Sequence, residues 1–236
     1  MAPISFQVNP EFAQITELTP GLFICGVSAL TAANMKAFKI SLIVNATKEV
    51  PNLKSLGEIQ RMKLWIDDVP EEDLFPSFDV VADNAHAVVQ DGGNVLIHCV
   101  AGVSRSATFC LAYLLKYQLR SLRAAYHFMS FKRPMVRPNI GFWRQLIHFE
   151  QLCKGNAGSV RLIRDEEQPE RLLPDVYLKN AVPEREGERT PSPDPKEAVF
   201  TEENRERNNS SGRLKFKFCP KLEPLREMNE TAAITA

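Results

Sequence analysis

The chain has 236 residues, in which 29 lysines and arginines balance 29 aspartates and glutamates. This balance excludes the strong positive field by which proteins bind nucleic acid or anionic membrane surfaces, so we expect neither as a partner. No apolar run approaches the ~20 residues that a membrane span needs, and the N-terminus lacks the apolar core of a signal peptide. Five cysteines without paired spacing indicate a reducing compartment. We expect the protein in the cytoplasm, with the nucleus as a further location.

Short apolar runs alternate with helical patterns along the first two thirds of the chain. The predicted strands are 22–25, 42–45, 62–66 and 94–98, and the predicted helices are 28–35, 78–89 and 107–115, followed by one helix capped by Ser121 and one that starts at Asn139. Strands that alternate with helices predict an α/β fold with a central, mostly parallel twisted sheet flanked by helices. The last two helices are expected to bury one face each, formed by Leu122, Ala125, Phe128 and Met129 and by Phe142, Leu146, Phe149 and Leu152.

Composition divides the chain into unequal parts. Beyond about residue 182 the sequence is polar, charged and rich in proline, and such a stretch cannot bury enough apolar surface to offset its chain entropy. We predict an N-terminal segment 1–14, a folded domain 15–182 and a disordered tail 183–236. Within the tail, residues 212–220 alternate basic and apolar side chains, which fits a solvated patch better than a docking strand.

The segment His98–Ser106, here called the cradle, joins a predicted strand to a predicted helix. N–H groups at a helix start lack internal partners and carry partial positive charge, so an anion can bind there. Arg105 can hold two phosphate oxygens at once, and Gly102 permits close backbone approach. Such a field lowers the pKa of a free thiol from ~8.5 to roughly 3.5–7.5, so Cys99 is predicted to be a thiolate nucleophile aimed at phosphorus. Three other cysteines are interpreted as ordinary buried residues, namely Cys25, Cys110 and Cys153.

The cradle carries a family resemblance. His98 and Cys99, then five residues, then Arg105 and Ser106 form the signature of the cysteine-dependent protein tyrosine phosphatases, and Ala101–Thr108 is similar to their dual-specificity branch. Over residues 15–182 the chain resembles an atypical, small dual-specificity protein phosphatase. The resemblance implies substrate binding by Val100, Ala101, Gly102, Val103, Ser104 and Arg105. It implies supporting roles for His98, Ser106 and Asn139.

Cleavage of a phosphate monoester also needs an acid that protonates the leaving oxygen. The loop 66–76, here called the acid loop, follows a predicted strand and carries several carboxylates. The resemblance places the acid just after this strand, about thirty residues before the cysteine. Asp68 lies 31 positions before Cys99 and is therefore predicted to be the general acid, with Asp67 as the near alternative and Asp73 as a distant one.

The resemblance implies two-step hydrolysis through a cysteinyl-phosphate intermediate, without a metal ion or another cofactor. Lipid phosphatases of the superfamily have lysines where this chain has Val100 and Val103, so phosphoproteins are the expected substrates. Phosphotyrosine, phosphoserine and phosphothreonine are all expected to react, and MAP kinases are candidate partners. The alternative function is a phosphoprotein-binding module without turnover, and the presence of Cys99, Arg105 and Asp68 argues against it.

Overall fold

The computed structural model describes residues 14–166 and 168–178. The N-terminal segment before residue 14, Cys219 and the predicted tail 183–236 lie outside the described residues. The described strands are β1 (Thr16–Thr19), β2 (Leu22–Cys25), β3 (Ile40–Ala46), β4 (Gln60–Leu64), β5 (Asn94–His98), β6 (Leu162–Arg164) and β7 (Leu172–Pro174). The described helices are α1 (Ala32–Ala37), α2 (Phe75–Gln90), α3 (Arg105–Tyr117), α4 (Leu122–Lys132) and α5 (Ile140–Lys154), with 3-10 turns η2 (Val27–Ala29), η3 (Lys54–Leu56) and η4 (Asp175–Tyr177).

The centre of the fold is a five-stranded sheet with the order β1-β2-β5-β3-β4. Strands β2, β5, β3 and β4 run parallel, which confirms the predicted mostly parallel sheet. Strand β1 pairs antiparallel with β2 and was not predicted. A separate antiparallel hairpin, β6 and β7, follows α5. None of the helices in the described ranges is long and apolar enough to cross a membrane.

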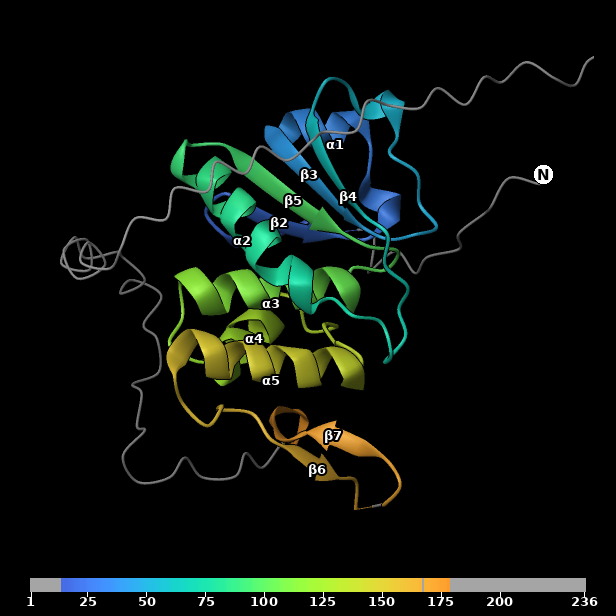
Figure 1. Cartoon of the computed structure of the whole chain (residues 1–236). Coiled ribbons are helices and arrows are strands. Elements are labelled where there is room, and N and C mark those ends of the chain that lie inside the picture. The colour runs from blue at the N-terminus through green and yellow to red at the C-terminus, as the bar shows by residue number, and fades with distance from the viewer. Residues whose placement is uncertain (1–13, 167, 179–236) are drawn as a thin grey trace, which may run out of the picture. The chain divides into compact units, whose positions relative to one another are not determined.

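Two hydrophobic layers cover the two faces of the sheet. Alternate residues of a strand point to opposite faces, so Val95 and Ile97 of β5 belong to one buried cluster and Leu96 belongs to the other. The larger cluster includes α2, α3, α4 and α5, and the smaller one includes α1. Figure 1 shows α3, α4 and α5 below the sheet and α1 above it. Helix α3 is buried along Arg105–Leu115 because it lies between the sheet and the other helices of the larger layer.

Most predicted elements match the observed ones, and the strands at 22–25 and 94–98 are confirmed residue for residue. The caps predicted at Ser121 and Asn139 are confirmed, because each side chain accepts a hydrogen bond from a backbone N–H of the first helical turn. The predicted strand 62–66 is displaced, since β4 ends at Leu64 and the Trp65 side chain is 72% exposed.

Three predictions are wrong. The helix predicted at 28–35 is divided into η2 and α1, because the Thr31 hydroxyl accepts the N–H of Asn34 and starts a new helix there. The buried face of α5 ends at Glu150, so Leu152 is exposed although its spacing fits the apolar stripe. For the same reason Cys153 is exposed, whereas Cys25 and Cys110 are buried as predicted.

Candidate active site

The site lies where four parallel strands end at one edge of the sheet. In parallel sheets this carboxyl edge gathers the loops that bind ligands. The segment after β2 donates the Val27 N–H to the Val100 carbonyl at 2.9 Å, and the segments after β3 and β4 both contact Arg105. The cradle follows the inner strand β5. It is therefore contacted by the segment after β2 on one side of β5 and by the segments after β3 and β4 on the other.

Four successive carbonyl groups of the cradle, those of residues 100–103, face the protein body. Those of Val100 and Val103 accept backbone N–H groups of Val27 and Arg137, at 2.9 and 2.8 Å. Those of Ala101 and Gly102 accept the Arg133 guanidinium, at 3.3 and 2.9 Å. In a trans peptide the following N–H points the opposite way, and the described residues contain no cis peptide bond. The N–H groups of residues 101–104 therefore converge on the side away from the protein body, an arrangement that binds anions.

The Cys99 thiol lies at the base of this ring of N–H groups. It is 2% exposed and accepts the Gly102 N–H at 3.2 Å and the Ser106 hydroxyl at 3.1 Å. Gly102 has φ +69°, and a Cβ there would lie 2.7 Å from the Cys25 backbone. Only glycine fits this position without displacing β2. Both donors point at the sulfur, the atom predicted to act as the nucleophile.

The Arg105 guanidinium is buried and held by a residue that the sequence reasoning missed. Glu49 lies in the loop after β3, and its carboxylate accepts a hydrogen bond from each terminal nitrogen of Arg105, at 2.7 and 2.8 Å. The hydrogen bond from Arg105 lowers the pKa of Glu49, so this carboxylate is charged at neutral pH. The Nε atom of Arg105 is buried without a hydrogen-bond acceptor in the described part of the chain. A carboxylate three residues after the end of an inner parallel strand was the available signal for Glu49.

Polar side chains of β3, β4 and the loop itself hold the loop that carries Glu49. Asn45 donates to the Val50 carbonyl at 2.8 Å and accepts the Thr47 hydroxyl at 2.7 Å. The Lys63 ammonium, on β4, donates to the carbonyls of Thr47 and Val50. Burial lowers the pKa of Lys63 to about 8. These contacts fix the backbone on both sides of Glu49, and so they position its carboxylate against Arg105.

The two adjacent aspartates of the acid loop point in different directions. The Asp68 Oδ1 atom accepts the Ser104 hydroxyl at 2.7 Å and the Asn139 amide at 2.9 Å, and its Oδ2 atom is 3.7 Å from Arg105 Nε. Asp67 instead pairs with the exposed ammonium of Lys48 at 2.8 Å. Asp73 accepts the Phe75 N–H at the start of α2. Of the three carboxylates considered from the sequence, the structure places only Asp68 against the cradle.

The acid loop rests on the first turns of α5. A Cβ at Gly141 would lie 1.8 Å from the Pro70 carbonyl oxygen, so the loop packs directly on the helix backbone. The Gln145 side chain accepts the Leu74 N–H at 2.8 Å and donates to the Glu72 carbonyl at 2.7 Å. Neither contact was predicted, because each joins residues about 70 positions apart.

His98 lies behind the cradle in the core. Its side chain is 2% exposed, and Nδ1 is 3.3 Å from the Cys99 carbonyl oxygen. Burial lowers the pKa of His98 to about 4, so the imidazole is neutral at physiological pH. A neutral, buried ring in this position supports the backbone at Cys99 and does not exchange protons with a substrate.

Comparisons with known proteins find matches that span the residues of the site. A family model described as dual specificity phosphatase, catalytic domain, matches residues 22–152, which include Glu49, Asp68 and the cradle. Dual specificity protein phosphatase 14 of Homo sapiens is 40% identical over 172 residues, 72% of this chain and 84% of that protein. Dual specificity protein phosphatase 18 of Homo sapiens is 38% identical over 178 residues, 75% of this chain and 92% of that protein.

One solved structure with a similar fold is that of a mouse putative dual specificity phosphatase complexed with zinc tungstate. It is 31% identical, superposes with a TM-score of 0.57, and covers 66% of this chain and 96% of that chain. The matched range of the family model includes β5, the cradle and α3.

Proposed function

The chain belongs to the dual specificity phosphatase family, and from this membership we propose that Cys99, Arg105 and Asp68 carry out its reaction. The observation that carries the proposal is the position of Cys99. Its sulfur accepts two hydrogen bonds beneath converging N–H groups, and Asp68 is bonded to Ser104 on the same loop. The nucleophile and the anion-binding N–H groups therefore lie on one short segment, and a hydrogen bond from that segment holds the acid beside them.

In the first step the Cys99 sulfur attacks phosphorus. The S–P bond forms, the bond from phosphorus to the leaving oxygen breaks, and Asp68 gives its proton to that oxygen. The N–H groups of residues 101–104 meet the charge on the equatorial oxygens. The Nε atom of Arg105 is the buried donor that a substrate oxygen would satisfy, while Glu49 holds the other two nitrogens in place.

In the second step water cleaves the cysteinyl phosphate. Asp68, now a carboxylate, accepts a proton from the water as the new P–O bond forms and the S–P bond breaks. The electron pair of that bond returns to sulfur, where the hydrogen bonds from Ser106 and Gly102 stabilise the thiolate. We assign His98 and Asn139 supporting roles, because each holds backbone or a side chain of the site and neither touches the sulfur.

We infer that the substrates are phosphoproteins that carry phosphotyrosine, phosphoserine or phosphothreonine. Val100 and Val103 on the cradle offer no cation for the further phosphates of an inositol lipid. MAP kinases, doubly phosphorylated on a Thr-x-Tyr segment, are our specific candidates. We place the activity in the cytoplasm and the nucleus, because a thiolate nucleophile needs a reducing compartment.

Hydrolysis of a small aryl phosphate under reducing conditions tests the proposal. We expect turnover by the full chain that Cys99→Ser abolishes, whereas Cys153→Ser, an exposed cysteine on α5, leaves it intact. Release of both phosphates from a doubly phosphorylated Thr-x-Tyr peptide would establish dual specificity. Tight phosphopeptide binding by the unaltered chain without any turnover would instead support a binding module.

A further inference from the structure

A cavity of about 500 Å³ adjoins the site on the side of the acid loop. It lies between the acid loop, the start of α5 and the β6–β7 hairpin. Its wall is continuous with the catalytic groups, since the lining residue Asn139 donates to Asp68 at 2.9 Å. Another lining residue, Arg137, donates its backbone N–H to the Val103 carbonyl at 2.8 Å. A protein whose phosphorylated residue enters the cradle therefore has neighbouring residues within reach of the cavity.

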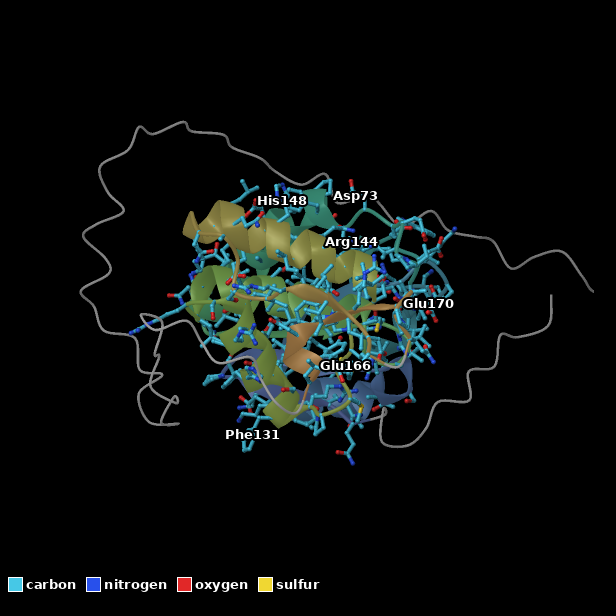
Figure 2. All side chains as sticks on the ribbon, turned by 90° about the horizontal axis from the view of Figure 1, so that it is seen from below. Asp73, Phe131, Arg144, His148, Glu166 and Glu170 are labelled. Carbon is cyan, nitrogen blue, oxygen red and sulfur yellow. The ribbon has the colours of Figure 1, made fainter. Side chains whose placement is uncertain are left out.

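Three arginines from three segments line this cavity. Arg137 precedes α5, Arg144 lies on α5, and Arg171 lies in the hairpin next to the one lining carboxylate, Glu170. Figure 2, the view from below, shows Arg144 on the yellow helix α5 and labels Glu170 of the hairpin on the same side. The wall thus carries three positive charges and one negative charge.

None of these arginines makes a salt bridge or a side-chain hydrogen bond with any residue in the described ranges. The Arg137 guanidinium lies 4.7 Å above the Tyr177 ring, which covers one face of the group and leaves its N–H edges open. By contrast, Arg105 and Arg123 are paired with carboxylates. Unpaired guanidinium donors around one cavity point to an anionic ligand.

The walls show which kind of anion fits. Pro70, Pro138 and Pro174 line the cavity and have no backbone N–H, so the amide donors that surround the cradle have no counterpart on these stretches of wall. The arginines come from separate segments, and all three are exposed. This arrangement suits carboxylates spread along a peptide better than one desolvated phosphate. Arginine binds each carboxylate through two parallel N–H groups.

We propose that this cavity is a subsite for acidic side chains of the substrate protein, on residues that flank the phosphorylated one. The inference rests on the proposed function, because it assigns the substrate class of the same site. The arginines act on recognition and not on the chemical step. Charge at the rim of an interface steers and selects a partner more than it raises affinity.

Two phosphotyrosine peptides test the subsite. They differ only in the residues around the phosphotyrosine, which are glutamate in one and glutamine in the other. We expect kcat/KM of the full chain to be roughly 5- to 10-fold higher for the glutamate peptide, mostly through KM, since exposed pairs each contribute little. This ratio should fall to about 1 in the double variant Arg144→Gln with Arg171→Gln. It should also fall when NaCl rises from about 0.05 M to about 0.5 M.

A matched control removes two exposed cations elsewhere, with Arg120→Gln and Lys132→Gln, and should keep the ratio of the unaltered chain. A ratio near 1 in the unaltered chain, or a ratio that the double variant retains, would overturn the subsite. A third peptide, with a non-hydrolysable phosphonate in place of one glutamate, tests the ligand class. Preference for that peptide alone would overturn the assignment to carboxylates. Failure to hydrolyse the small aryl phosphate would instead contradict the proposed function.

Discussion

The cradle and the acid loop face each other across the site but are built in different ways. In the cradle, four successive carbonyl groups are bound to the protein body and the nucleophile is 2% exposed. The acid loop follows the exposed Trp65 and is held mainly by the side chains of Ser104, Asn139 and Gln145. The phosphate-binding half is thus fixed through its own backbone carbonyls, by two backbone N–H groups and the buried Arg133 side chain, whereas the proton-donating half depends on a few side-chain contacts that single substitutions can remove.

The largest expected effect separates the two aspartates of the acid loop. We expect Asp68→Asn to lower kcat on the order of 10²–10⁴-fold, because an amide cannot protonate the leaving oxygen. Asp67→Asn removes only an exposed pair with Lys48 and should change kcat less than about 2-fold. Steady-state kinetics on a small aryl phosphate measures both. The reverse order would identify Asp67 as the acid.

Gly141→Ala should disturb the acid loop alone. The new Cβ would lie 1.8 Å from the Pro70 carbonyl oxygen, so the loop must move away from α5. A displacement of about 1 Å of a catalytic group can cost 10²-fold, and we expect kcat to fall roughly 30- to 100-fold. The rate at which iodoacetamide alkylates Cys99 should stay within about 2-fold. An equal fall in both rates would show that the two halves are not independent.

Protonation of His98 should weaken the cradle half as pH falls. The folded pKa is about 4 and the ordinary value is 6.5, so the unfolded chain binds the proton first and stability is lost from pH 6.5 downward. At pH 5 this amounts to about 2 kcal/mol of the free energy of unfolding, and the loss continues until about pH 4. Urea unfolding at pH 7 and pH 5 measures it. His98→Gln should lack this part of the pH dependence, and an unchanged dependence would contradict the assignment.

Glu49→Gln should give the smallest of the four effects. The amide keeps the size of the side chain but loses the charge that fixes Arg105, so we expect kcat/KM to fall about 10-fold. Glu58→Gln, an exposed carboxylate near the start of β4, is the matched control and should have no effect. A fall of less than 2-fold for Glu49→Gln would show that the cradle holds Arg105 without help.

The parts of this site that the sequence predicts are the local ones. Strand β5, the cradle, the capped start of α5 and Asp68 lie in segments whose own pattern or motif marks them. Arg133, Gln145 and Glu49 act over 30 or more positions. The place of Glu49 after an inner strand marks a candidate site residue, but no periodicity or spacing indicates the partner of any of the three. The error at Leu152 has the opposite origin, because the helical repeat continues beyond the last turn that the core covers. The error at Cys153 comes from residue type, since cysteines are usually buried and this one is exposed.

The chain has two tryptophans, one exposed at the start of the acid loop and one buried in α5. Trp65 introduces the acid loop, is 72% exposed and lies 4.9 Å from the Lys63 ammonium. Trp143 is fully buried on α5 and donates its indole N–H to the Tyr177 hydroxyl at 2.7 Å. A solvent-exposed indole emits at longer wavelength than a buried one and is quenched by acrylamide. The natural fluorescence of this protein therefore contains two separable signals, one from the entrance of the acid loop and one from the packed helix beneath it.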